Sequence, residues 1–165
     1  MKELFKGYVK TRNKKCTQKF ANGEKLLTFE EAEKLEEYAG ILAENTILID
    51  IDDQEQSEIL MKIVEDRQID CLVLDTTRGR HFYFKNTNVQ KCYTGVKLAC
   101  GLTADIKVGS KNTYAILKFK GENRFVEWEK ESREYAELPK WLLPVDTKAE
   151  LYGMTEGDGR NQALF

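Results

Sequence analysis

The sequence is 165 residues long, with 41% hydrophobic and 33% charged residues and a formal net charge of −2 at pH 7. This is enough chain for one domain with a hydrophobic core, and the composition is that of an ordinary globular protein. No apolar run approaches the roughly 20 residues of a membrane span, and residues 1–6 lack the apolar segment of a secretory signal. We therefore expect a cytoplasmic protein without a membrane partner.

The first predicted element is a helix. Thr28 and Glu31 form a capping-box pattern, in which each side chain bonds to the backbone N–H of the other residue. We expect this helix to run through Tyr38, with Gly40 placed to end it.

An apolar run at residues 46–49 predicts a buried strand, and Asp50 and Asp52 follow it. Side chains alternate between faces along a strand, so both carboxylates are expected on one face. They repel each other unless a cation lies between them, so loss of either should not lower stability. Oxygen ligands of this kind suit Mg²⁺ or Mn²⁺. The alternative is that these acids only leave the strand and cap the next helix.

The next region is expected to fold as helix, strand, turn and strand. Apolar residues at helical spacing predict an amphipathic helix over 54–66, and residues 71–74 predict a strand. Arg78 and Gly79 form a tight turn into a third strand, 80–85, whose residues alternate between two faces. We therefore predict a mixed sheet with helices on one side.

Residues 103–108 alternate again, which puts Asp105 and Lys107 on one face. A turn at 109–112 predicts that residues 113–119 return as the hairpin partner of this strand.

The cysteines and the last predicted helix are assigned no chemistry. The four cysteines form no Cys-x-x-Cys pair, so free thiols are expected, and with one histidine in the chain no zinc site is expected. They are Cys16, Cys71, Cys92 and Cys100. A short helix is expected between Pro139 and Pro144, with Trp141 and Leu142 packed on the core.

Charge is unevenly distributed along the chain. Residues 2–19 are lysine-rich with Glu3 as the one acid, residues 24–75 are strongly acidic, and residues 76–104 contain no acid. Such segregation can place positive surfaces around a negative metal site, as a phosphate-bearing substrate requires. For the N-terminal run alone, a solvated terminus without a partner is the favoured interpretation.

The polar faces of the expected strands carry a constellation of three carboxylates, one imidazole and one ammonium. They are Asp50, Asp52, Asp105, His81 and Lys107. Three carboxylates beside a phosphate-binding cluster are what two-metal phosphoryl transfer requires. A lone histidine on a strand more often has a structural role. The turn at 76–80 before His81 favours a phosphate-binding role instead. Its hydroxyls, glycine and guanidinium groups can direct donors at phosphate oxygens.

In order and spacing, these residues resemble the three catalytic motifs of the archaeo-eukaryotic primase superfamily. The motifs are Asp50-x-Asp52, Thr77-x-Gly79-x-His81 and Ala104-Asp105. More specifically, the chain is similar to the primase-polymerase domains at the N-termini of phage and plasmid replication proteins. The sequences of residues 26–32 and 159–161 also resemble members of that group. The resemblance covers nearly the whole chain, although Gly79 stands where many relatives have serine.

The resemblance implies an α+β fold, with an RRM-like mixed β-sheet as catalytic core and flanking helices. By position, Asp50, Asp52 and Asp105 would be the catalytic carboxylates and hold two Mg²⁺ or Mn²⁺ ions. The nucleotide's phosphates would be contacted by a second group of residues. These are Thr77, Arg78, Gly79, His81 and Lys107.

The leading hypothesis is therefore a template-dependent nucleotidyltransferase that makes or extends primers in phage or plasmid DNA replication. Its partners would be single-stranded DNA template, nucleoside triphosphates and a fused or associated helicase. We expect the catalytic domain over residues 1–150 and the start of a linker or helical region of a longer protein over 151–165. Two alternatives are a non-catalytic nucleic-acid-binding module, with Tyr83 as a base-stacking residue, and a metal-dependent nuclease.

Overall fold

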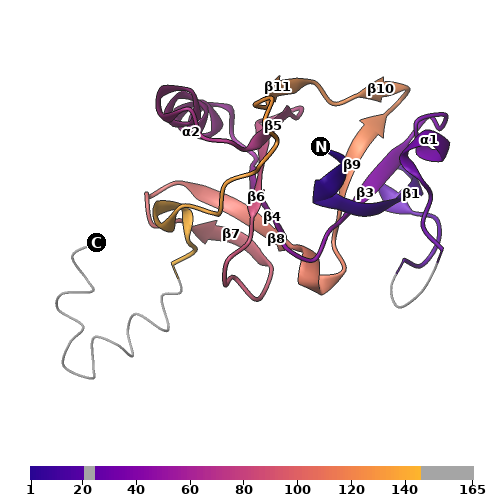
Figure 1. Ribbon diagram of the computed structural model, residues 1–165, viewed down its shortest axis with the longest axis horizontal. Helices are drawn as coiled ribbons and strands as arrows, with labels where there is room; N and C mark the ends of the chain where they lie inside the picture. The colour runs from indigo at the N-terminus through magenta and orange to yellow at the C-terminus, as the bar shows by residue number, and fades with distance from the viewer. Residues whose placement is uncertain (21–24, 146–165) are drawn as a thin grey trace.

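The computed structural model describes residues 1–20 and 25–145, which form two antiparallel β-sheets with few helices (Figure 1). The strands are β1 (Phe5–Arg12), β2 (Lys15–Cys16), β3 (Tyr38–Leu42), β4 (Thr46–Ile51), β5 (Leu72–Asp75), β6 (Arg80–Lys85), β7 (Tyr93–Lys97), β8 (Thr103–Val108), β9 (Tyr114–Phe119), β10 (Glu122–Asn123) and β11 (Val126–Trp128). The helices are α1 (Phe29–Ala32) and α2 (Gln54–Arg67), with 3₁₀ turns η1 (Lys2–Leu4), η2 (Gly109–Lys111) and η3 (Lys140–Leu142). The chain thus combines α and β structure, as predicted, and strands predominate.

The larger sheet has six strands in the order β11-β5-β6-β4-β8-β7. Helix α2 joins β4 to β5, and β6 lies between these two strands, antiparallel to both. This is a split β-α-β unit. The predicted mixed sheet is wrong, because every pair of named strands is antiparallel. The cause is the tight turn before β6, which returns the chain into the gap between β4 and β5.

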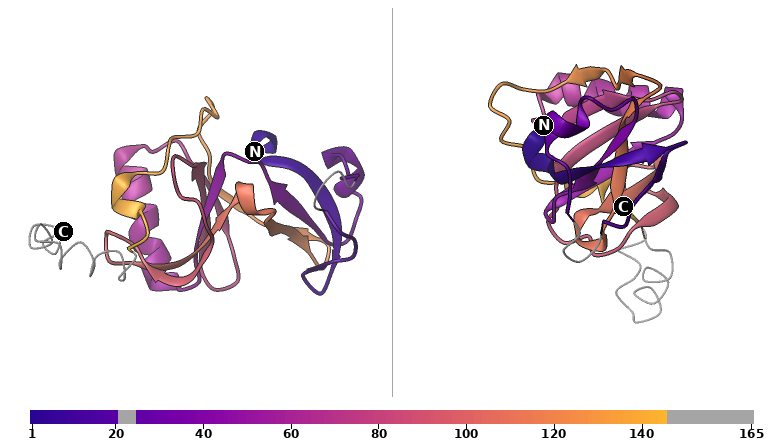
Figure 2. Two further views of the ribbon diagram at one scale, coloured as in Figure 1. Left: turned by 90° about the horizontal axis from the view of Figure 1, so that it is seen from below. Right: turned by 90° about the vertical axis from the view of Figure 1, so that its right-hand side faces the viewer.

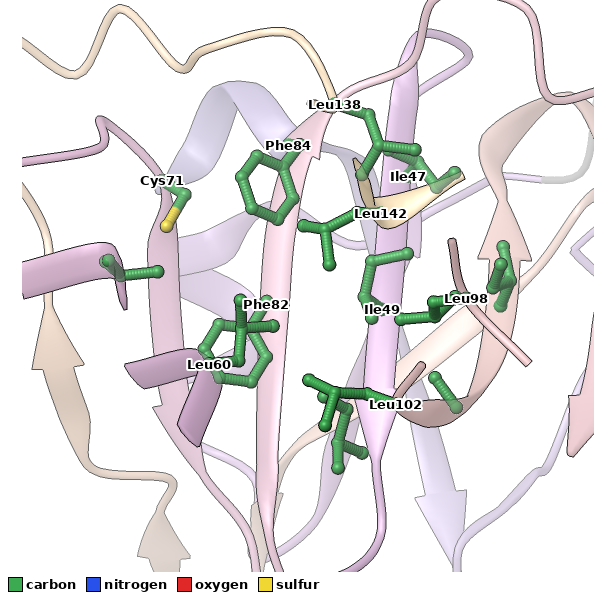
Figure 3. Close-up of a cluster of buried hydrophobic side chains, with 14 of the residues drawn as sticks. Ile47, Ile49, Leu60, Cys71, Phe82, Phe84, Leu98, Leu102, Leu138 and Leu142 are labelled. Carbon is green, nitrogen blue, oxygen red and sulfur yellow. The ribbon is translucent and has the colours of Figure 1, made fainter. Parts of the chain in front are cut away.

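One face of this sheet is covered by α2 and η3. The main hydrophobic core lies between this face and these two elements (Figure 3). Ile49 and Phe82 from β4 and β6 meet Leu60 of α2 and Leu142 of η3, and all four are fully buried. Burying a side chain of this size contributes about 1.5–3 kcal/mol. The predicted strands 46–49, 71–74, 80–85 and 103–108 and the helix 54–66 are confirmed, with small shifts in their ends.

The second sheet has the order β10-β9-β3-β1-β2 and packs on the opposite face of the first (Figure 2). Leu48 and Tyr83 of the larger sheet share a core cluster with Phe5, Leu42 and Leu117 of the smaller one. The larger sheet therefore has α2 on one side and a second sheet on the other. Its two faces carry different chemistry, because polar residues occupy part of the inter-sheet face.

The predicted helix through Tyr38 is wrong. The capping box is present, with Thr28 and Glu31 bonded as expected, but α1 ends at Ala32. Tyr38–Leu42 is instead the central strand β3, which is buried throughout its length. Gly40 lies inside this strand, where a Cβ would come within 2.5 Å of the Phe5 ring. Pairing with β1 and β9 outweighs the local helical signal.

The predicted hairpin between residues 103–108 and 113–119 is also wrong. Strand β8 pairs with β4 and β7, whereas β9 pairs with β3 and β10 in the other sheet. The turn at Gly109 carries the chain from one sheet to the other. A Cβ at Gly109 would lie 1.7 Å from the carbonyl oxygen of Ala43, so the glycine permits a close backbone approach.

The N-terminal lysines lie on structure that the sequence did not suggest. Most of them flank or lie within β1, an interior strand of the smaller sheet, on which Lys6 and Lys10 are exposed. Among residues 1–20 and 25–145, no helix has the length and apolar character needed to cross a membrane. The boundary predicted at residue 150 and the region predicted over 151–165 lie outside the described residues.

Candidate active site between the two sheets

Asp50 on β4 lies at the centre of a row of polar side chains. Its direct cross-strand partners are His81 on β6 and Asp105 on β8. Residues directly opposite each other on antiparallel strands point to the same face. Leu48, two residues before Asp50, packs in the cluster between the sheets, so the whole row faces the smaller sheet. The predicted meeting of these three side chains is thus present in the strand register.

Asp50 and His81 are in contact on the face of the larger sheet that is turned to the smaller sheet, and we call the space between these two faces the cleft. His81 Nε2 lies 3.4 Å from Asp50 Oδ2, and the two side chains are only 10% and 23% exposed. Burial by itself raises the pKa of Asp50, but the hydrogen bond and charge of His81 outweigh it. The positive charges of Lys107 and Arg124 add to this effect, so the pKa of Asp50 lies below its ordinary value. Asp50 is therefore held as a carboxylate.

Asp105 is fixed by the neighbouring edge strand. Its Oδ1 accepts a hydrogen bond of 2.7 Å from the backbone N–H of Gly95, where the pairing of β7 with β8 is irregular. Two carboxylates directly opposite each other on neighbouring strands destabilise a sheet unless positive groups compensate. Here the compensating groups around Asp50 are His81, Lys107 and Arg124.

Asp52 lies outside this row. Strand β4 ends at Ile51, so Asp52 is exposed, and its Oδ2 pairs with Arg78 Nη2 at 2.7 Å. Asp52 still lines, with Asp50 and Asp105, a hollow of about 140 Å³. The capping alternative holds for Asp53, whose Oδ1 accepts from the backbone N–H of Gln56 at the start of α2.

The turn before β6 is built by Thr76 and Gly79. The backbone N–H of Gly79 donates to Thr76 Oγ1, and the N–H of Thr76 donates to the Gly79 carbonyl, each at 3.0 Å. A Cβ at Gly79 would lie 1.9 Å from the carbonyl oxygen of Ile51. A side chain therefore does not fit at this position unless the turn moves. Thr77 and Arg78 are exposed beside the hollow's mouth, where Arg78 holds Asp52.

Arg80 does not belong to this phosphate-directed cluster. It lies on the α2 side of the sheet, where Nη1 donates to Ser57 Oγ at 2.8 Å. Its Nε donates to Glu127 Oε1 at 2.7 Å, which ties β6 to β11. The expectation that both guanidinium groups of the turn face phosphate is therefore wrong for Arg80, because strand alternation sends it to the opposite face.

Lys107 and Arg124 bring positive charge into the cleft. Lys107 Nζ donates to the carbonyl of Tyr114 at 3.0 Å and so joins β8 to β9. An ammonium group has three donors, so this bond leaves it able to contact an anion. Arg124 was not found from the sequence. It follows β10, where its Nε donates to the Ile116 carbonyl at 2.8 Å.

The donor set fits Mg²⁺ or Mn²⁺ in its chemistry, with Asp50 and Asp105 as the core of the site. Within the described part of the chain, no three His, Cys, Asp or Glu residues are grouped closely enough to hold a metal ion, and Asp52 is turned to Arg78. Mg²⁺ is commonly bound by one or two carboxylates together with substrate phosphates. Asp50 and Asp105 form such a pair, whereas Asp52 does not join them as the third predicted ligand.

Compared with protein-family models, with curated proteins and with solved structures, the chain matches none. The candidate site is therefore argued from its own residues.

Proposed function

We propose that the chain is a template-dependent nucleotidyltransferase, a DNA primase or polymerase that makes or extends primers and acts with a helicase in replication. The observation that carries this proposal is the row of Asp105, Asp50 and His81 across β8, β4 and β6. It sets two carboxylates and an imidazole side by side on a sheet, inside a cleft with positive charge nearby. Nucleases and phosphatases also use carboxylates beside phosphate-binding groups, so the choice of a polymerase rests on the order of the motifs along the chain.

In this proposal Asp50 and Asp105 hold Mg²⁺ or Mn²⁺ together with the phosphates of a nucleoside triphosphate. Asp52 joins them when a phosphate draws Arg78 away, since a guanidinium binds phosphate oxygens in bidentate geometry. His81 and Lys107 contact the triphosphate from the sheet. The bound ions supply activation of the attacking 3′-hydroxyl and stabilisation of the charge that develops on the phosphates.

The order of strands supports a catalytic core related to the RNA-recognition fold. Strands β5, β6, β4 and β8 are neighbours in that order, and α2 connects β4 to β5. The proposed catalytic residues of this core lie on the two central strands and on β8. The face opposite α2 carries them, and Gln56 in the first turn of α2 also lines the hollow at the two carboxylates.

The alternative of a non-catalytic binding module was based on Tyr83 as the base-stacking residue, and Tyr83 cannot take this role. Tyr83 is fully buried in the cluster between the sheets, so its ring is not available to stack on a base. Among the residues described, Phe125 is the exposed aromatic, and it precedes β11 rather than lying on the sheet face.

Isothermal titration of the protein with a nucleoside triphosphate, with Mg²⁺ or Mn²⁺ and with chelator, tests the proposal. Because triphosphate and carboxylates repel each other, binding should be weak in chelator and should tighten sharply with divalent ions. Single-stranded DNA, held mainly by lysine and arginine, should bind without metal and weaken as salt rises. Triphosphate binding that ignores divalent ions, or no such binding beside intact DNA binding, favours the binding module instead.

A further inference from the structure

A second hollow, of about 240 Å³, lies in the cleft beside the proposed catalytic row. Its walls are mostly apolar side chains from both sheets and from α1. They include Phe29, Tyr38, Leu74, Leu117 and Val126. Arg124 and Asn123 are polar groups at the same hollow.

This hollow adjoins the catalytic row through one cross-strand pair. Leu74 on β5 is the direct cross-strand partner of His81, which is the partner of Asp50. Neighbouring strands lie about 4.7–4.9 Å apart, so the Leu74 wall is two strand spacings, roughly 9.5 Å, from Asp50 along one face of the sheet. A ligand with a charged end and a flat apolar end can therefore occupy both places at once.

Arg124 connects the two places electrostatically. It lines the hollow, and its positive charge acts on Asp50. One buried polar atom of the row, His81 Nδ1, has no hydrogen-bond partner among the described residues. Buried polar atoms are nearly always paired in proteins, so an unpaired imidazole nitrogen at this place points to a ligand.

We infer that this hollow binds the base and sugar of a nucleotide whose triphosphate lies at Asp50, Asp105 and His81. The inference rests on the proposed function and adds the place of the nucleoside. Apolar and aromatic walls suit the faces of a base, while Arg124, which lines the hollow and acts on Asp50, suits the phosphates that link the two.

Substitution of Val126 by tryptophan tests this inference by filling the hollow from its rim. Val126 is 41% exposed, so the larger side chain enters without replacing a core residue. Two ligands are titrated at equal Mg²⁺, a nucleoside triphosphate and inorganic tripolyphosphate. The wild type should bind the nucleotide about tenfold more tightly than tripolyphosphate, because stacking on apolar walls adds to the phosphate contacts. Val126→Trp should lose this advantage and keep its affinity for tripolyphosphate.

Asn123→Trp fills the same hollow from the exposed strand β10 and serves if Val126→Trp does not fold. Ser110→Trp is the matched control, since Ser110 is exposed and lines a different, polar hollow. Equal affinity of the wild type for the two ligands, or full nucleotide affinity in both hollow-filling variants, overturns the inference and leaves the proposed function standing. Failure of the wild type to bind either ligand overturns the proposed function and this inference with it.

Discussion

Asp50 combines a proposed catalytic role with a structural one. The sequence suggested that loss of a repelled carboxylate leaves stability unchanged, but the folded protein holds Asp50 beside His81 with a pKa below its ordinary 3.8. A depressed carboxyl pKa adds stability above the unfolded value, and this stability is lost as pH falls through the folded pKa.

Asp50→Asn should therefore be less stable than wild type at pH 7, by about 1 kcal/mol, because a charge-assisted hydrogen bond to His81 is replaced by a weaker neutral one. The difference should shrink below pH 4, where the wild-type carboxyl is protonated in the unfolded chain and then in the folded one. Urea unfolding at several pH values without divalent ions measures it. Glu58→Gln, an exposed carboxylate on α2, is the control. An Asp50→Asn protein more stable than wild type at neutral pH would show that repulsion dominates.

His81 is expected to act on the nucleotide more than on the template. His81→Gln removes a phosphate contact, so the apparent KM for nucleotide should rise by roughly tenfold while template affinity stays the same. If the contact tightens in the transition state, kcat should fall as well. Steady-state kinetics with varied nucleotide measures both. An unaltered nucleotide dependence together with a large fall in Tm would identify His81 as a structural residue, consistent with its burial.

The turn before β6 positions Asp52 and Arg78 through a single close contact. Because a Cβ at Gly79 would lie 1.9 Å from the Ile51 carbonyl, Gly79→Ala must push the turn away from the end of β4. Overpacking of this kind costs about 1–3 kcal/mol, so thermal melting should show a clear loss of stability. Thr77→Ala, at an exposed position in the same turn, should melt like wild type. Equal melting of the two variants would mean that the turn yields without strain.

Asp75 on β5 and Glu127 on β11, which both lie beside Arg80 of β6, form a pair of carboxyl groups that makes stability depend on pH. Burial and the neighbouring Glu127 raise the pKa of Asp75 to about 6, while Glu127 is held ionised by Asp75 and Arg80. A raised carboxyl pKa contributes stability below the unfolded value near 4, and this is lost as pH rises through about 6. The Asp75 side chain is 43% exposed, so solvent screening keeps the effect small.

Asp75→Asn should therefore gain stability relative to wild type above pH 6 and differ little from it below pH 4. Melting temperatures from pH 3 to pH 8 measure this. A wild-type advantage that grows with pH would contradict the assigned direction of the pKa shift.

Strands β4, β5, β6 and β8 of the larger sheet were predictable because each has a strong local pattern, whereas β7 and β11 were not predicted. The apolar run before Asp50 and the alternation around Asp105 identify strands whatever their partners are. Gly40 and residues 113–119 could not be placed in this way, since their environment comes from strands distant in the sequence. The capping box at Thr28 correctly predicted the start of a helix, but this helix is only one turn long.

The two-sheet arrangement determines which site residues the sequence could reveal. Asp50, His81 and Asp105 meet because their strands are neighbours, which alternation and motif order anticipated. Arg124 and the hollow beside it depend on the packing of the second sheet over the first, and no local pattern predicts that packing. The cleft between the sheets is thus the part of the molecule that only the three-dimensional structure shows.

Primer extension on single-stranded template, with labelled nucleotides and Mg²⁺ or Mn²⁺, tests the proposed reaction most directly. The wild type should add nucleotides in a template-dependent manner and stop in chelator. Asp50→Asn and Asp105→Asn should each lose at least about 100-fold of this activity, because metal stabilisation of the transition state is worth several kcal/mol, and Glu58→Gln should keep it. No incorporation by the wild type under any of these conditions, template degradation in its place, or full activity in either aspartate variant would contradict the proposal.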